Sequence, residues 1–155
     1  MAVREPAASS RRCVIKAHYV QLRTPKGAKS AKEHLEYLER DGVERDGSPG
    51  RFYAADENFV AEEIRAPLEG EERQFRFIVS PEETDGLDLT EFTRRLMGQV
   101  EKDLGRRLIW AAVNHHNTDN THVHIVIRGV DRDGTRSSKS PRACGVSGSR
   151  SPPRH

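Results

Sequence analysis

One stretch, residues 115–127 (HHNTDNTHVHIVI), constrains the fold of this 155-residue chain more than any other. Its second half alternates between polar and apolar side chains, which is typical of a β-strand with one buried face. Three apolar residues share one face of this predicted strand: Val123, Ile125 and Ile127. His122 and His124 share the other face, where residues two apart lie about 6.5–7 Å from each other. Two imidazoles at that spacing can converge on one ion.

A third histidine is expected to join this pair. His115 lies seven residues before His122, at the end of an apolar run (108–113) that is predicted to form the preceding strand. A polar turn at residues 117–120 would fold the two strands into an antiparallel hairpin and bring His115 beside the pair. Three neutral imidazoles can hold a divalent ion and leave a coordination position open, as a catalytic centre requires. The alternative is a solvent-facing strand that happens to carry histidines, and this interpretation fits His116, which points away if His115 points inward.

The length and composition fit one domain with a small core. A chain of 155 residues is long enough to bury a core, but 32% of its residues are charged and 34% are hydrophobic. No apolar run approaches the length of a membrane span, and residues 1–12 lack the apolar segment of a signal peptide, so no membrane insertion is expected. Cys13 and Cys144 match no metal-ligand spacing, which suits a reducing cytoplasm.

The charge is unevenly distributed along the chain. The sequence has 26 Lys plus Arg against 24 Asp plus Glu, but five of the basic residues and none of the acidic ones lie from Thr135 onward. The remaining 21 basic residues leave residues 1–134 with a net charge of about −3. Phosphate binding normally requires an electropositive face, so this balance argues against broad nucleic-acid binding. A local basic face is still allowed, because several cations are concentrated early in the chain: Arg12, Lys16, Arg23, Lys26 and Lys29.

Periodicity and turn signals predict four strands, at residues 13–22, 74–80, 108–113 and 122–129. They also predict two clear helices, at residues 28–40 and 89–104, and a weak one at residues 57–66. Ser30 to Glu33 can form a capping box for the first helix, while Asp88 caps the second, which stops at Gly105. The first helix has an apolar stripe that is expected to be buried: Ala28, Ala31, Leu35 and Leu38.

Tyr37 lies away from the apolar stripe of this first helix. A step of about 100° per residue places it roughly 140° from the centre of the stripe, on the same outward side as Glu33 and His34. A tyrosine needed for packing would more naturally occupy the stripe. Tyr37 is therefore either an ordinary exposed aromatic residue or a group presented to a ligand, and the helix alone does not decide between these interpretations.

The predicted order β-α-loop-β-α-β-β indicates an α+β fold, an antiparallel sheet with helices on one face. The helices are expected to cover the face with Val123, Ile125 and Ile127, which would leave the histidine face open to a substrate. Three regions are expected along the chain: a disordered leader (1–12), a core (13–134) and a disordered tail (135–155). The change to a Ser-, Arg- and Pro-rich tail is abrupt, which is also consistent with an out-of-frame C-terminus.

Three motifs resemble, in order, those of the plasmid mobilization relaxases of the P class, within the HUH endonuclease superfamily. The pattern His115-x6-His122-x-His124, followed by Ile-Val-Ile, resembles the three-histidine motif of these proteins. Residues 31–42 (AKEHLEYLERDG) resemble their first motif, in which a tyrosine on an early helix is the nucleophile. Residues 74–81 (QFRFIVSP) are similar to a strand between the two. The relatives continue well beyond this point, so the resemblance implies a truncated relaxase.

The resemblance implies a metal-dependent, site- and strand-specific DNA nuclease with an HUH, ferredoxin-like core. Such enzymes nick one strand at a transfer origin, become attached to its 5′ end through a phosphotyrosine, and carry that strand into a recipient cell. By resemblance, Tyr37 is the nucleophile, and His115, His122 and His124 are metal ligands. The expected ion is Mg²⁺ or Mn²⁺, while histidine ligands also allow Zn²⁺, Ni²⁺ or Co²⁺. His34, close to Tyr37 on the helix, is a candidate proton acceptor.

The expected partners are single-stranded DNA at a transfer origin, accessory mobilization proteins and a conjugation coupling protein, and the expected location is the cytoplasm. Two alternatives stay open. A replication initiator or transposase of the same superfamily usually places its tyrosine after the histidines, and no tyrosine follows His124 here. A truncated, inactive remnant would bind metal or DNA without cleavage. Tyr19, in a predicted strand, and Tyr53, in a loop, are the rival nucleophiles.

Overall fold

The computed structural model describes four stretches of the chain: residues 12–56, 62–65, 71–116 and 119–130. The predicted tail and nearly all of the predicted leader lie outside these stretches, as do parts of the weak helix (57–66) and of the hairpin turn (117–120). Within the described residues, no helix is both long enough and apolar enough to cross a membrane.

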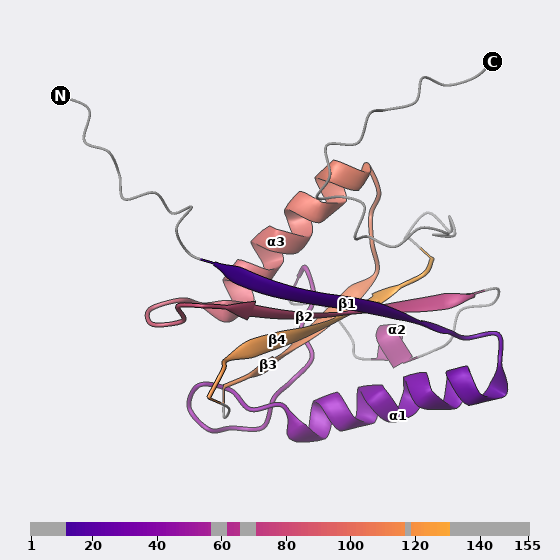
Figure 1. Cartoon of the computed structure of the whole chain (residues 1–155), viewed down its shortest axis with the longest axis horizontal. Helices are drawn as coiled ribbons and strands as arrows, with labels where there is room; N and C mark the ends of the chain where they lie inside the picture. Colours follow the sequence, from indigo (N-terminus) through magenta and orange to yellow (C-terminus); the bar gives the residue numbers. More distant parts are fainter. Residues whose placement is uncertain (1–11, 57–61, 66–70, 117–118, 131–155) are drawn as a thin grey trace, which may run out of the picture.

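Four antiparallel strands form one sheet in the order β1-β2-β4-β3 (Figure 1). The elements follow one another along the chain as β1 (Cys13–Gln21), α1 (Pro25–Asp41), α2 (Glu62–Arg65), β2 (Arg73–Pro81), α3 (Leu89–Leu104), β3 (Trp110–His115) and β4 (His122–Arg128). The strands β3 and β4 are joined as the predicted hairpin. The predicted α+β fold with an antiparallel sheet is confirmed.

The two long helices lie on opposite faces of the sheet, whereas the sequence predicted helices on one face (Figure 1). Helix α3 packs on the face with Val123, Ile125 and Ile127, where Leu89 and Met97 join the main core. Helix α1 packs on the histidine face, where Leu35 and Leu38 of its apolar stripe join a second core. Ala31 is also buried, but Ala28 is exposed, so the predicted burial of the stripe is wrong at its first residue. The single-sided arrangement of the helices is therefore corrected, and the histidine face is partly covered.

Apolar residues on the histidine face explain why a helix covers it. Strand β3 is buried along its whole length, and Ala111 and Val113 lie on the same face as His115. These two residues pack with Leu35 and Leu38 of α1. Burying apolar surface stabilises a fold by roughly 25 cal/mol per Å², so the apolar part of this face requires a partner. A continuous apolar run such as 108–113 is typical of a strand buried on both faces.

Helix α1 begins at Pro25, earlier than predicted, and Thr24 rather than Ser30 is its N-cap. The Thr24 hydroxyl accepts a hydrogen bond from the backbone N–H of Gly27 at 3.0 Å. Proline suits the first position because its fixed φ is helical and its missing N–H has no helical partner there. The predicted Ser30–Glu33 capping box is therefore wrong.

The loop after α1 runs back along the outer edge of β3. Val43 N–H donates to the Asn114 carbonyl at 3.1 Å, and His116 N–H donates to the Val43 carbonyl at 2.9 Å. Further along the loop, Tyr53 exchanges two backbone hydrogen bonds with Ala112, at 3.0 and 2.8 Å. These bonds protect the edge of the sheet and tie the end of α1 to the strand that carries His115.

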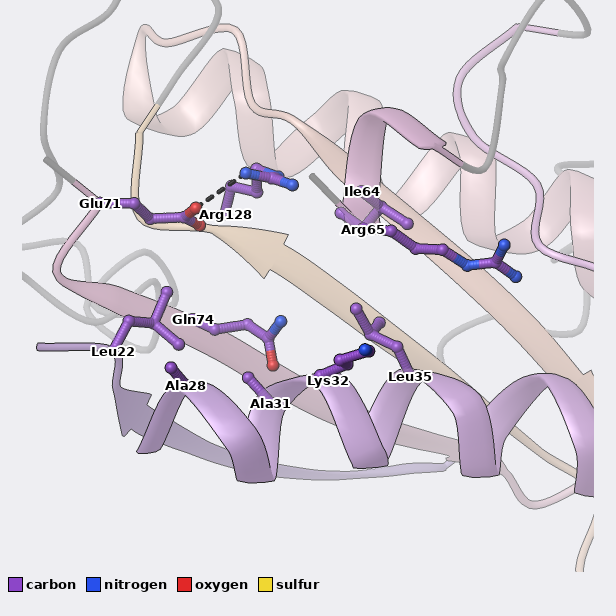
Figure 2. A pocket seen from close by; sticks show the side chains of 10 residues that line it. All are labelled: Leu22, Ala28, Ala31, Lys32, Leu35, Ile64, Arg65, Glu71, Gln74 and Arg128. Carbon is purple, nitrogen blue, oxygen red and sulfur yellow. Dashed lines mark hydrogen bonds and ion pairs between the residues drawn. The ribbon is translucent and has the colours of Figure 1, made fainter. Parts of the chain in front are cut away.

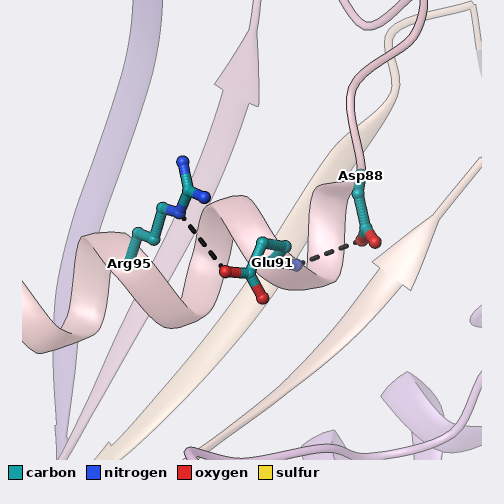
Figure 3. Close-up of polar contacts among 3 residues, drawn as sticks. All are labelled: Asp88, Glu91 and Arg95. Atoms are coloured by element: carbon teal, nitrogen blue, oxygen red, sulfur yellow. Dashed lines mark hydrogen bonds and ion pairs between the residues drawn. The ribbon is translucent and has the colours of Figure 1, made fainter.

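Helix α3 has the ends that its sequence predicted. The Asp88 carboxylate accepts from the backbone N–H of Glu91 at 3.1 Å, and Gly105 adopts a left-handed φ of 63° as the C-cap. Figure 3 shows this N-cap together with an exposed ion pair one turn further on, in which Arg95 Nε lies 3.3 Å from a Glu91 carboxylate oxygen.

A cavity of about 370 Å³ lies between α1, α2 and the sheet (Figure 2). It has an apolar lining with a charged part, in which Arg128 of β4 and Glu71 form an ion pair with Nη1–Oε2 at 2.7 Å. Both side chains are deeply buried, with exposed fractions of 2% and 4%. The apolar lining comes from Leu22, Ala28, Ala31, Leu35 and Ile64.

We expect Glu71→Gln to lower the free energy of unfolding by about 3 kcal/mol, because removing one partner leaves the other charge buried without it. The matched control is Glu91→Gln, since Glu91 pairs with Arg95 at 80% and 53% side-chain exposure for the arginine and the glutamate. An exposed pair contributes at most about 1 kcal/mol, so this control should change little. Urea unfolding measures both, and equal losses would contradict the assignment.

Candidate active site

Three histidine rings converge at the end of the β3–β4 hairpin. His115 and His122 are directly paired across the two strands, and His124 follows on the same face of β4. The ring centroids lie 5.0 Å apart for His115–His122, 4.6 Å for His115–His124 and 4.9 Å for His122–His124. One nitrogen from each ring lies within 4.8 Å of the others. The convergence predicted from the sequence is confirmed, while metal binding stays a prediction.

The ring nitrogens are arranged as ligands to an ion would be. His122 Nδ1 lies 2.8 Å from the Asn120 carbonyl oxygen, so a proton on Nδ1 is donated there and Nε2 keeps its lone pair. That Nε2 lies 3.2 Å from His124 Nε2. His115 Nε2 is buried and has no hydrogen-bond partner among the described residues. A divalent ion between the rings fits this donor set, because it would satisfy all three nitrogens at once.

Burial lowers the pKa of His115 and of His124, which keeps these two rings neutral at pH 7, as metal ligands must be. It lowers the pKa of His124 to about 3, with further lowering by the nearby histidines, foremost His115 and His122. The pKa of His115 is also lowered, first by burial and then by His122, while Asp41 opposes the shift. His115 and His124 are therefore uncharged, and uncharged ligands leave the full charge of a bound ion available to a substrate.

Tyr37 lies on the same flank of α1 as His34, which contacts one of the three histidines. His34 is about 60° away from it around the helix axis, and the His34 ring meets the His124 ring edge-on at a centroid distance of 6.3 Å. Tyr37 is 46% exposed, and the Arg40 guanidinium lies 5.8 Å from its ring centroid. Its hydroxyl makes no hydrogen bond within the described stretches, so this oxygen is accessible to a ligand.

The two rival tyrosines lie on the opposite side of the sheet. Tyr19 pairs with Phe75 across β1 and β2, on the face that α3 covers, and its ring lies 6.3 Å from the Phe75 ring. The Tyr53 hydroxyl donates to Asn114 Oδ1 at 2.7 Å, and burial raises the pKa of Tyr53. Neither hydroxyl faces the three histidines.

Two residues near the site were not singled out from the sequence. His18 of β1 and Arg76 of β2 are directly paired, on the same face as His124. The pKa of His34 is lowered to about 4, by burial first and then by Arg76 and His18, which places both close to it. Their alternation in the strands is visible in the sequence, but their proximity depends on which strands pair.

The fold and the site together define a class: an α+β domain whose antiparallel sheet gathers three histidines beside a helix with an exposed tyrosine, as in the HUH nucleases. The family model described as "Relaxase: MobA/VirD2-like, nuclease domain" matches residues 20–144. This match covers most of the chain, so the protein belongs to that relaxase family. The resemblance to mobilization relaxases that the motifs indicated is confirmed.

The match supports DNA nicking in mobilization as the general function, since relaxases of this kind bind single-stranded DNA at an origin and are generally metal-dependent. It extends into the predicted tail, which begins at Thr135. A comparison with curated proteins gave no match.

We expect His115→Ala to weaken Mn²⁺ binding at least about tenfold, because one of three nitrogen ligands is lost. Isothermal titration calorimetry at pH 7.5 measures this affinity. His116→Ala is the matched control, since its neighbour His115 belongs to the cluster and His116 does not. Equal affinities of wild type and His115→Ala would remove His115 from the site.

The stability of the fold should fall as the pH drops from 7 to 5. The pKa of His124 is lowered to about 3 and that of His34 to about 4, whereas an unfolded histidine titrates near 6.5. Below about pH 6.5 the unfolded chain takes up protons that the folded chain does not, so stability is lost progressively toward pH 4. Thermal unfolding should show a smaller loss between pH 7 and 5 for His34→Gln than for wild type; an identical loss would contradict this.

Proposed function

We propose that this chain nicks one DNA strand at a specific site and transfers it through a phosphotyrosine at Tyr37, with a divalent ion held by His115, His122 and His124. One observation carries the proposal. All three tyrosines of the chain lie in the described stretches, and Tyr37 alone combines an exposed ring and an unbonded hydroxyl with a place on the helix that covers the histidine face.

The reaction exchanges one phosphoester for another. The Tyr37 oxygen attacks the scissile phosphorus, and the bond from phosphorus to the 3′ oxygen of the preceding nucleotide breaks. The tyrosine loses its proton, and the departing 3′ oxygen gains one to become a hydroxyl. The bound ion would polarise the phosphate and stabilise the charge of the transition state. The new ester retains the energy of the broken bond, which permits religation.

The chain's own residues contribute orientation and proton transfer. A tyrosine has an ordinary pKa near 10, so it needs help to lose its proton at pH 7. His34 is neutral at that pH and lies on the same flank of α1, so it can accept the proton. Its lowered pKa makes it a weak acceptor, which is compatible with transient rather than permanent ionisation of Tyr37.

The same proposal includes a metal ion, a substrate and partner proteins. The working ion would be Mg²⁺ or Mn²⁺, with Zn²⁺, Ni²⁺ or Co²⁺ as further possibilities for three imidazole ligands. The substrate would be single-stranded DNA at a transfer origin in the cytoplasm. Accessory mobilization proteins and a conjugation coupling protein would deliver the attached strand to a recipient cell.

The decisive measurement is a covalent protein–DNA adduct. The full chain is incubated with Mn²⁺ and a pool of single-stranded oligonucleotides that carry a randomised centre, and adducts are isolated on a denaturing gel and sequenced. Tyr37→Phe removes only a hydroxyl from an exposed ring, so folding should be unchanged while the adduct falls at least about a hundredfold.

Tyr19→Phe and Tyr53→Phe are the matched controls and should retain the adduct. An adduct that persists in Tyr37→Phe but is lost in Tyr53→Phe would move the nucleophile to the loop and leave the histidine site in place. No adduct in any variant, together with normal Mn²⁺ binding, would favour a metal-binding remnant without nuclease activity.

A further inference from the structure

Arg76 of β2 is a buried cation that has no ionic partner in the part of the chain that the structure describes. The residue is 8% exposed. Its Nε donates to Gln74 Oε1 at 3.1 Å, and its Nη2 donates a long hydrogen bond of 3.4 Å to the Ser30 carbonyl of α1. Within the described stretches, no carboxylate lies within ion-pair distance of this guanidinium. Burying an unpaired charge is costly, so such a group is expected where an anion can bind.

The position of Arg76 relates it to the histidine site. It is paired directly with His18 of β1, and Ile78, two residues further along β2, is paired with His124. Arg76 and His124 are therefore diagonal neighbours on one face, about 7–8 Å apart along the sheet. Helix α1 lies over both: its Ser30 carbonyl contacts Arg76, and His34, one turn later, contacts His124.

Lys16 extends this positive surface toward the edge of the sheet. It is exposed, lies on the same face as His18, and is paired with Ile78, whose other neighbour is His124. Glu33, on the outward flank of α1, is paired with Lys29 at 3.7 Å, so the two charges offset each other. We call Lys16, His18 and Arg76 the β1–β2 cationic track. It begins beside His124 and leads away from the three histidines.

We propose that the β1–β2 cationic track binds a second phosphodiester of the DNA strand, next to the one held at the histidines. This inference rests on the proposed function, because it places the same strand. Arg76 would be a positioning residue: its fixed guanidinium holds one phosphate, and the strand then presents the neighbouring phosphate to Tyr37. A guanidinium suits this role because its planar set of donors matches the oxygens of a phosphate.

A phosphodiester fits better than an isolated carboxylate. The strand backbone offers negative charges at regular intervals, and the track places Lys16 and Arg76 on two neighbouring strands rather than in one pocket. The buried Arg128, by contrast, already has Glu71 as its counter-charge. His18 is exposed and adds a ring N–H that can donate to a phosphate oxygen.

The salt dependence of DNA binding tests the track without requiring cleavage. The affinity of the full chain for a fluorescent single-stranded oligonucleotide is measured by anisotropy between 50 and 300 mM NaCl, using the sequence recovered in adducts or, without adducts, the randomised pool. One phosphate contact contributes a slope of about 0.7 to the plot of log affinity against log salt. Arg76→Gln should lower the slope by about 0.7 and weaken binding about tenfold or more.

Three further variants make the result specific. Lys16→Gln changes an exposed residue and should also lower the slope, while Arg76→Lys keeps the charge and should preserve the slope but weaken binding. Arg95→Gln, on α3 at the other face, is the matched control and should leave the slope unchanged. Normal Mn²⁺ binding by Arg76→Gln verifies that its histidine site is intact.

Each outcome decides one of the two proposals. A wild-type slope in folded Arg76→Gln overturns the track and leaves the nicking function untouched. If Arg76→Gln fails to fold, an unchanged slope in Lys16→Gln overturns the track instead. Wild-type protein that does not bind single-stranded DNA overturns both proposals. A lowered slope in the variants of a protein that never forms the Tyr37 adduct supports the track and overturns nicking.

Discussion

Two backbone hydrogen bonds join Val43 to the end of β3, one to the carbonyl of Asn114 and one from the N–H of His116. They fix where α1 ends relative to His115, and so they fix how far Tyr37 is from the histidines. Gly42 makes this pairing possible, because a Cβ at that position would lie 2.3 Å from a methyl group of Val113. The proposed nucleophile and the proposed metal site lie on different elements, and these main-chain hydrogen bonds define the distance between them.

The same contacts connect packing to chemistry. Leu35 and Leu38 of α1 bury the apolar part of the histidine face, and His34 of the same helix lies against His124, whose pKa is lowered by burial. A histidine must be neutral to bind a metal ion, so the packing of α1 on this face favours the ligand form of His124. A substitution that loosens α1 would therefore weaken metal binding and stability together, whereas a change in Tyr37 would affect neither.

The sequence predicted the hairpin and its histidines well, because alternation and a short turn set the register of β3 and β4 locally. The sequence prediction placed α1 on the wrong face of the sheet. Both faces of β3 are apolar, and periodicity does not indicate which helix covers which face of the sheet. The prediction also missed the Thr24 cap, because Ser30 and Glu33 match the pattern of a capping box later in the same helix. Arg76 escaped notice for a different reason: its neighbours come from strands that are distant in sequence, so tertiary structure alone reveals them.

The net charge of residues 1–134 does not indicate whether one face of the domain can bind DNA. Residues 1–134 carry about −3, which argued against broad nucleic-acid binding. The four strands nevertheless contain no acidic residue, and three of their four basic residues lie on the histidine face: Lys16, Arg76 and Arg128, of which Arg128 is paired with Glu71. The acidic residues of the described stretches lie in the helices and connecting segments. Because salt screens exposed charges beyond about 8–10 Å, a phosphate on the sheet responds to the nearby cations more than to the whole chain. A mildly acidic domain can therefore bind a single strand along one face while it repels nucleic acid elsewhere.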